Sequence, residues 1–422
     1  MYSPKVTKIL ALTGLIIYKL KANTSLLLTN DITLSSSYVI TAPISLNGNF
    51  FKIKYSNNAT LTWQGKTKGW YDLQTTELGE IIKTDAPLSV GDYVICQSND
   101  KINIDPHSSG GIQHPHEIHL INSVKPKMAG VESFVVDKMV GNLSILNPLE
   151  NICVSNLVAE YEGKQADYCT ALKFDGVANT TLSGIHFKKN GPGAIWFNNA
   201  YNTSVNQCRL DGTLANDNVY AITIGTVNNF FISDCLITGA RHAFTTTAAI
   251  SKGAERWGTP LNVIMNNCVI NVPTKDDNTT RVGLDTHAEG YGILFKGCVI
   301  NIGGGNCNYG ANARSRKTVF SGCTFNGSGI SKGVEIYGEN CQVDNCTFNK
   351  CWIGISTKKF RNDYANNLSV HNCIFNDNSG PPIYLEFGKN HIVTNPVFNN
   401  VMFSPGSKFK SQPPIIGTYR TK

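Results

Sequence analysis

Asp344-Asn345-Cys346-Thr347-Phe348 is one of seven copies of a phrase in which an apolar residue stands two positions after a cysteine. The copies are Asn206–Leu210, Ser233–Ile237, Asn266–Ile270, Lys296–Ile300, Ser321–Phe325, Asp344–Phe348 and His371–Phe375. Their cysteines follow one another at steps of 27, 33, 30, 25, 23 and 27 residues. A period of this size with no helical pattern inside it predicts a solenoid.

The segments between the phrases have the chemistry of strands and turns. Short alternating runs such as Ala221–Ile224 and Gly333–Tyr337 are broken by Asn and Gly. Strands that recur once per coil stack in register, and each coil then buries the same inward positions. We therefore expect an all-β chain that forms a parallel β-helix with a column of cysteines inside it.

The cysteines are better explained by packing than by disulfides. Seven of the 13 occupy one repeated position, each followed by an apolar residue two places on. Small, weakly polar thiols pack well in a stacked column. A disulfide framework is the alternative if the protein is secreted, but the repeated position favours reduced core thiols.

We expect three segments: an N-terminal cap at 1–24, the β-helix at 25–403, and a Ser-, Pro-, Gly- and Lys-rich tail at 404–422, extended or poorly ordered. The apolar run Ile9–Tyr18 is too short to span a bilayer. A signal peptide remains the alternative for this run, but lysines on both sides of it favour a cap. No membrane insertion is expected.

Residues 63–150 interrupt the repeat pattern of the coils. Alternation in Val90–Ile95 and Glu117–Ile121 predicts an antiparallel excursion inserted into the β-helix. The polar stretch 97–116 contains three histidines without the fixed spacing of metal ligands. We interpret it as a flexible loop, and we expect no metal and no other cofactor.

The charge balance favours an acidic partner. With 37 Lys and Arg against 30 Asp and Glu, the net charge is +7. An excess of this size suits an anionic polysaccharide. Nucleic acid is not expected, because the sequence has no run rich in Lys and Arg.

In each repeat, a strand about 11–13 residues before the cysteine position should point its alternate side chains outward. The expected inward residues are Leu172 and Phe174, Ile195 and Phe197, Ile222 and Ile224, Leu284 and Thr286, Ala311 and Ala313, Val334 and Ile336, Ile353 and Ile355, and Ile383 and Leu385. Their outward neighbours are Lys173 and Asp175, Trp196 and Asn198, Thr223, the segment around Arg241 and His242, Asp285 and His287, Asn312 and Arg314, Glu335 and Tyr337, and Tyr384 and Glu386.

This outward face gathers carboxylates, imidazoles, guanidinium groups and aromatic rings. Aromatic rings stack on sugar faces, and Arg or His can hold acidic groups. Carboxylates one or two coils apart lie roughly 5–10 Å apart by strand spacing, a range used in glycoside hydrolysis. The alternative interpretation is an ordinary solvated surface.

Two segments carry a family resemblance. Gly239–Thr247, which contains Arg241-His242, and Leu284–Gly290, which contains Asp285-Thr-His287, resemble the signature of pectate-lyase-like β-helix proteins. Many of those proteins are phage tailspikes and polysaccharide depolymerases. Val90–Val94 and Glu117–Ile121 are similar to the excursion that tailspikes insert after their first coils.

The resemblance covers roughly residues 25–400. It implies a right-handed single-stranded parallel β-helix and a homotrimer with parallel axes. It also implies a bacterial capsular or exopolysaccharide as partner, and a place in a virion tail or outside the cell. The clustered aspartates that calcium-dependent pectate lyases place on their strands are missing from this sequence.

The first hypothesis for function is cleavage of such a polysaccharide by hydrolysis. Asp285 and Glu335 form the best acid and base pair, with Glu289 in reserve, because one carboxyl must donate a proton while the other activates water or attacks. The other expected site residues hold the substrate or tune the carboxylates: His287, Arg241, His242, Trp196, Asn312, Arg314, Tyr337 and Tyr384.

Two other hypotheses remain open. In a lyase, Arg241 or Arg314 would neutralise a uronate while His287, His242 or Tyr337 abstracts the proton. In a glycan-binding adhesion module without turnover, Asp285 and His287 would only bridge neighbouring coils.

Overall fold

The computed structural model describes residues 6–9, 24–75, 79–100, 112–131, 139–162, 169–190, 193–212, 219–247, 250–252, 255–274, 279–360, 363–401, 415–416 and 420–421. Most of the expected cap at 1–24 and tail at 404–422, together with His107, lies outside these residues. No helix that is long and apolar enough to cross a membrane occurs within the described ranges.

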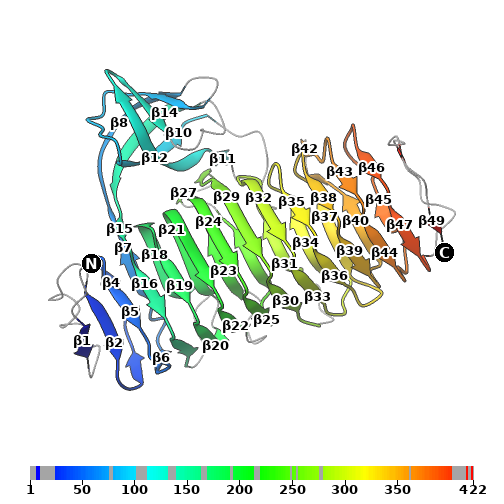
Figure 1. Ribbon diagram of the computed structural model, residues 1–422, viewed down its shortest axis with the longest axis horizontal. Coiled ribbons are helices and arrows are strands. Elements are labelled where there is room, and N and C mark those ends of the chain that lie inside the picture. Colours follow the sequence, from blue (N-terminus) through cyan, green and yellow to red (C-terminus); the bar gives the residue numbers. More distant parts are fainter. Residues whose placement is uncertain are drawn as a thin grey trace.

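The chain winds into a right-handed parallel β-helix, as its sequence predicted (Figure 1). A representative coil contains β31 (Arg281–Thr286), β32 (Tyr291–Lys296) and β33 (Val299–Ile302). Each strand pairs in parallel with its counterpart one coil later, at β34, β35 and β36 respectively. The solenoid therefore has three faces, which we call the first, second and third face in the order in which a coil visits them.

The first face holds the outward side chains that the sequence singled out. Its strands are β4 (Tyr38–Ile40), β7 (Leu61–Gln64), β18 (Thr170–Ala178), the first part of β21 (Gly193–Asn206), β23 (Tyr220–Ile224), β26 (His242–Thr246), β31, β34 (Asn308–Ala313), β37 (Lys332–Ile336), β40 (Ile353–Thr357) and β45 (Ile383–Tyr384).

The second face continues from β1 (Val6–Ile9) to the last described coils. Its strands are β1, β2 (Ser25–Leu28), β5 (Ser45–Asn47), β16 (Cys153–Ser155), β19 (Thr181–Ser183), the last part of β21, β24 (Val227–Ser233), β29 (Pro260–Asn266), β32, β35 (Val319–Ser321), β38 (Gln342–Asp344), β43 (Ser369–His371), β46 (Ile392–Thr394) and β48 (Ile415–Ile416).

The third face directly follows the cysteine phrases. Its strands are β3 (Ile32–Leu34), β6 (Lys52–Tyr55), β17 (Val158–Tyr161), β20 (His186–Asn190), β22 (Arg209–Gly212), β25 (Leu236–Thr238), β30 (Val269–Val272), β33, β36 (Thr324–Asn326), β39 (Thr347–Asn349), β44 (Ile374–Asn376), β47 (Val397–Asn399) and β49 (Arg420–Thr421). Asparagines three positions after the cysteines form a ladder on this face, with Asn349 Nδ2 donating to Asn326 Oδ1 at 2.8 Å and Asn376 Nδ2 donating to Asn349 Oδ1 at 2.8 Å.

The repeated phrase works as a sharp corner between the second and third faces. The residue before the cysteine has a left-handed backbone in every copy, for example φ 53° at Asn267 and φ 52° at Asn345. Gly and Asn adopt this conformation most readily, so they recur there. The seven cysteines behind the corner are buried and free, as the packing interpretation predicted.

Stacked aromatic rings continue this core along the axis. Phe325, Phe348 and Phe375 lie in consecutive coils, with ring centroids 5.0 Å and 5.1 Å apart. All three are fully buried. Because equivalent positions stack, phenylalanine recurs at this position in consecutive coils.

The excursion forms a closed antiparallel barrel that stands beside the early coils (Figure 1). Its strands are β8 (Lys66–Thr75), β9 (Ile81–Lys83), β10 (Tyr93–Ser98), β12 (His116–Lys125), β13 (Met128–Val131) and β14 (Val140–Asn147). Hydrogen bonds tie β12 to the solenoid: Thr226 Oγ1 donates to the His116 carbonyl at 3.2 Å, and Asn228 Nδ2 to the Ile118 carbonyl at 2.9 Å.

The prediction of a flexible loop at 97–116 was wrong at both ends, because Gln97 and Ser98 belong to β10 and the last residues also form strands. His114 ends the strand β11 (Ile112–His114), which pairs with β28 (Glu255–Trp257) next to β27 (Ile250–Lys252). Its ring stacks on Trp257 with centroids 4.7 Å apart, and His116 is buried where β12 begins. These histidines were mistaken for loop residues because the prolines beside them suggested a turn.

Candidate functional site

Strand register places the outward side chains of the first face in columns. The centre column reads Lys173, Trp196, Thr223, Thr245, Asp285, Asn312, Glu335, Ser356 and Tyr384 from coil to coil. Residues just beyond the strand ends, among them His287, Arg314, Tyr337 and Lys358, lie on one side of this column. On its other side lie Tyr220, His242, Val282, Tyr309, Lys332 and Ile353.

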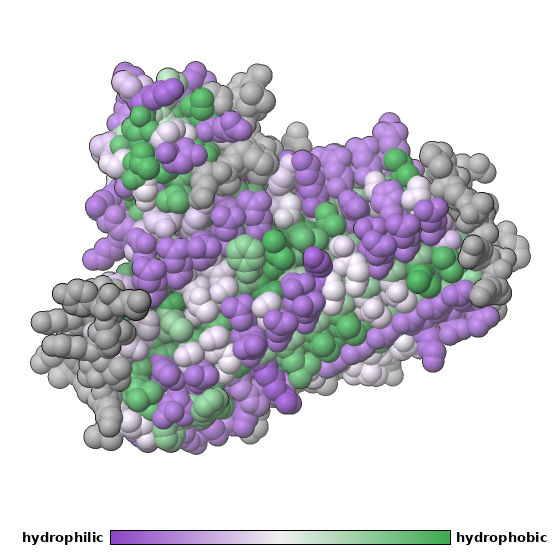
Figure 2. Space-filling model, in the orientation of Figure 1, coloured by the Kyte–Doolittle hydropathy of each residue, from purple (hydrophilic) through white to green (hydrophobic). Residues whose placement is uncertain are grey.

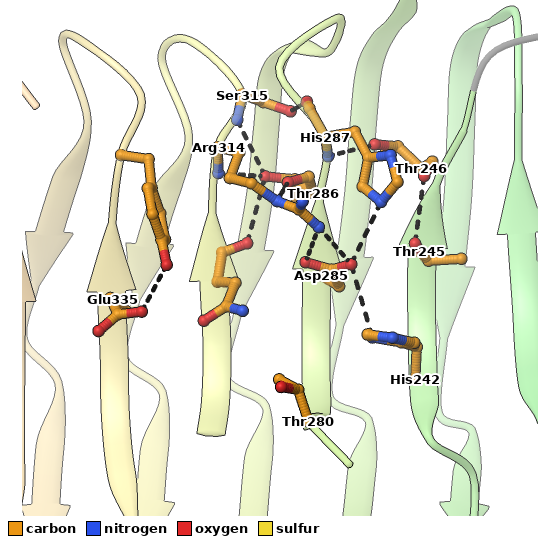
Figure 3. Close-up of polar contacts among 12 residues, drawn as sticks. His242, Thr245, Thr246, Thr280, Asp285, Thr286, His287, Arg314, Ser315 and Glu335 are labelled. Atoms are coloured by element: carbon orange, nitrogen blue, oxygen red, sulfur yellow. Dashed lines mark hydrogen bonds and ion pairs between the residues drawn. The ribbon is translucent and has the colours of Figure 1, made fainter. Parts of the chain in front are cut away.

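Asp285 is the centre of a charged network that spans three coils (Figure 3). Arg314 Nη2 donates to Asp285 Oδ1 at 2.6 Å and to Oδ2 at 2.7 Å. His287 Nε2 and His242 Nδ1 lie 3.3 Å and 3.5 Å from Oδ2. Burial alone raises the pKa of Asp285, but Arg314 and the two imidazoles outweigh it and hold the pKa well below its usual range.

His242 is a neutral imidazole in this network. Its ring stacks on Tyr220, with centroids 5.0 Å apart and an interplanar angle of 9°. Burial lowers the pKa of His242 to about 3, although the charge of Asp285 opposes the shift. At neutral pH the ring therefore contributes packing against Tyr220 rather than positive charge.

His287 is fixed from several sides. Its backbone N–H donates to Thr246 Oγ1 at 2.6 Å, and Ser315 Oγ donates to its carbonyl at 2.5 Å. Its Nδ1 lies 3.8 Å from Glu289 Oε1. Glu289 has 0% exposure, so this reserve carboxylate is buried behind His287.

Glu335 lies in a second network, two coils beyond Asp285. Tyr337 Oη donates to Glu335 Oε2 at 2.6 Å, and Lys332 Nζ donates to Oε1 at 3.2 Å. Lys358 Nζ approaches Oε1 to 4.0 Å. Burial, followed by the charge of Glu335, raises the pKa of Tyr337, so the phenol stays protonated and donates to the carboxylate.

The two carboxylates belong to one column and have a single intervening residue. Asp285 pairs with Asn312, and Asn312 pairs with Glu335. Two strand spacings put their backbones roughly 10 Å apart. All three residues are at most 9% exposed.

The remaining predicted residues lie at the edges of this region. Arg241 precedes β26 and donates from Nε to the Thr280 carbonyl at 3.2 Å. Trp196 lies three coils before Asp285, with Lys173 Nζ 3.8 Å from its ring centroid. Tyr384 lies two coils after Glu335 and donates to Glu386 Oε2 at 3.1 Å. Trp196 therefore lies outside the networks around Asp285 and Glu335.

The sequence reading missed Lys332, Ser356 and Lys358. Alternation had placed Ile353 and Ile355 on the inward side, but register pairs Ile353 with Lys332 and Ile355 with Val334. Alternation fails here because Gly354 also faces inward, where an added Cβ would meet Phe375 Cδ1 at 2.7 Å. The recurring glycine at this position, at 283, 310, 333 and 354, was the available signal.

The surface of the molecule is mostly hydrophilic in the view of Figure 2, with apolar residues in separate patches. Within the described ranges, no group of three or more His, Cys, Asp or Glu side chains could hold a metal ion. The first face presents carboxylate, imidazole, phenol, guanidinium and ammonium groups.

No protein-family model and no curated protein sequence matches the chain. Among solved structures, the tailspike gp61 of Pseudomonas phage phi297 superposes with a TM-score of 0.66 at 13% identity, over 94% of this chain and 65% of that one. The tailspike gp49 of Pseudomonas phage LKA1 gives 0.60 at 14% identity, over 92% and 75% of the two chains.

The Gp54 tailspike of Acinetobacter baumannii bacteriophage AP22, solved in complex with an A. baumannii capsular saccharide, gives a TM-score of 0.58 at 12% identity. The match covers 93% of this chain and 68% of that one. The chain thus spans about two thirds to three quarters of the length of these proteins. It has the parallel β-helix fold of phage tailspikes, as the sequence resemblance predicted.

Proposed function

We propose that the chain is a depolymerase that cleaves a bacterial capsular or exopolysaccharide on its first face by glycoside hydrolysis. The observation that carries this proposal is the column Asp285–Asn312–Glu335, in which two buried carboxylates face the same side. A surface polysaccharide as substrate is supported by the capsular saccharide bound to the AP22 tailspike. A homotrimer, located in a virion tail or outside the cell, is part of the same proposal.

The environment of Asp285 supports a division of roles between the two carboxyl groups. Because Arg314 keeps the pKa of Asp285 well below its usual range, Asp285 stays ionised and cannot donate a proton. The carboxyl left for the general acid is Glu335, which must first take up a proton before it donates to the glycosidic oxygen while Asp285 activates water. A gap of two strand spacings leaves room for that water and favours inversion at the anomeric carbon.

A lyase is the second candidate, supported by the position of Arg314 between His287 and Tyr337. A uronate carboxylate at Arg314 would be neutralised, and one of the neighbouring groups would take the adjacent proton. This function is less well supported, because Arg314 already binds both oxygens of Asp285.

Mass spectrometry of glycan fragments tests the proposal. The purified protein is incubated with a panel of capsular and exopolysaccharides, and saturated repeat-unit oligosaccharides are the expected products. Products lighter by one water with an unsaturated uronate would establish the lyase instead. A glycan that binds but yields no fragments would establish an adhesion module. Proton NMR of fresh products should show the inverted anomer.

A further inference from the structure

Trp352 is an exposed aromatic side chain at the edge of the first face, directly before β40. It is 44% exposed, and its backbone N–H donates to the Ser331 carbonyl at 2.8 Å. A Cβ added at Gly380 would lie 2.6 Å from the indole Cδ1 and 2.7 Å from Nε1. The Gly380 backbone therefore packs against the edge of the indole and fixes its position while one surface stays open.

Lys332 connects this indole to Glu335. Its ammonium lies 5.9 Å from the ring centroid of Trp352 and 4.9 Å from that of Tyr309. The same ammonium donates to Glu335 Oε1 at 3.2 Å and to Tyr309 Oη at 3.3 Å. Two aromatic rings and Glu335 are thus grouped around one ammonium.

Polar atoms that lack protein partners flank Glu335 in the centre column. Asn312 precedes it and Ser356 follows it in register. Asn312 is 9% exposed and Ser356 is 2% exposed. Asn312 Oδ1 and Ser356 Oγ make no hydrogen bond to any residue that the structure describes. Buried polar atoms require partners, and sugar hydroxyl groups would supply them.

We propose that Trp352, Tyr309, Asn312 and Ser356 form a subsite for one pyranose unit next to Glu335. The apolar C–H face of the sugar lies on the indole, as expected for an aromatic ring with an open surface, while its hydroxyl groups bond to Asn312 and Ser356. The position of this subsite relative to the cleaved bond rests on the proposed function, but binding of a sugar there does not.

Binding of purified bacterial capsular polysaccharides, measured by titration calorimetry, tests the subsite. The variants are Trp352→Ala, Trp352→Phe and Ser356→Ala. The matched control is Trp70→Ala, because Trp70 is 55% exposed on β8 of the barrel. We expect Trp352→Ala to weaken binding about tenfold or more, Trp352→Phe to retain most of it because a ring remains, and Trp70→Ala to leave it unchanged.

The outcomes separate the subsite from the proposed function. If Trp352→Ala binds every glycan as tightly as the wild type, the subsite is wrong even where the wild type cleaves that glycan. If no glycan is cleaved but Trp352→Ala loses binding, the subsite stands and hydrolysis fails. Equal losses in Trp352→Ala and Trp70→Ala would also overturn the proposal, as would the absence of binding by the wild type.

Discussion

Arg314 binds both carboxylate oxygens of Asp285 on the neighbouring coil, at 2.6 Å and 2.7 Å. The side chain of Asp285 is 2% exposed and that of Arg314 is 17% exposed. The pair therefore joins two coils in a largely buried position, and it fixes the charge state of the carboxylate as well as its orientation.

Asp285→Asn should destabilise the fold strongly. Removing one partner of a buried pair leaves the other charge uncompensated, which costs about 3–5 kcal/mol. The depressed pKa also makes this contribution pH-dependent: it is complete above the unfolded pKa of about 4 and is lost as pH falls below it. Urea denaturation of the variant measures the loss at pH 7, and Asp344→Asn on the partly exposed second face is the control. Equal stability of the two variants would contradict the prediction.

Glu335→Gln should abolish cleavage while the fold is retained. A positioned general acid contributes about 10²–10⁴-fold to the rate, and glutamine keeps the shape of the side chain without a proton to donate. Release of reducing ends measures the effect. Glu339→Gln, in the turn after β37, is the matched control. Undiminished cleavage by the Glu335 variant would remove this residue from the mechanism.

Mild acid should destabilise the protein through its buried histidines. Burial lowers the pKa of His242 to about 3 and that of His116 to about 4, against about 6.5 in an unfolded chain. As pH falls from 6.5 to 4, the unfolded state binds protons that the folded state excludes, so stability falls by up to about 1.4 kcal/mol per pH unit for each histidine.

Denaturation midpoints at pH 7.5, 6.5, 5.5 and 4.5 would show this slope. The double variant His116→Gln and His242→Gln should have a flatter profile than the wild type. A pH-independent wild type would refute the assignment.

Phe348→Ala should cost about 3–5 kcal/mol of unfolding free energy, the usual loss for a buried phenylalanine. Its ring stacks between Phe325 and Phe375, so truncation removes contacts on two neighbouring coils. Ile330→Ala, at a side chain 46% exposed, should change stability by less than about 0.5 kcal/mol. Denaturant titration compares the two variants, and a small effect at Phe348 would mean that the core rearranges around the gap.

The thiols should all be reduced. Ellman's reagent added to denatured protein without reductant should titrate all 13 cysteines. In the native protein the exposed Cys153 and the half-buried Cys307 should react fast, while the buried cysteines of the stacked column should not react. A shortfall of two or more thiols after denaturation would reveal a disulfide and contradict the packing interpretation.

The sequence predicted the outward positions well wherever strict alternation holds. Asp285, Asn312 and Glu335 were expected on one face, and register places them in one column. The prediction failed in the coil of Ile353. Gly354 and Ile355 both face inward there, so Ile353 takes the same outward position as Lys332 in the preceding coil. The prediction also missed Lys332, which lies three residues before Glu335 on the same strand, and Ser356, which the next coil places beside Glu335.

The sequence by itself determined the solenoid, since each turn needs a residue that tolerates a left-handed backbone, a small thiol behind it and an apolar strand after it. These are local requirements, repeated at every corner. Only the tertiary structure decided which polar groups meet. Loops of different length separate the coils, so Arg314 reaches Asp285, and Lys332 reaches Trp352, through stacking between coils. The spacing of these residues along the chain does not by itself predict these contacts.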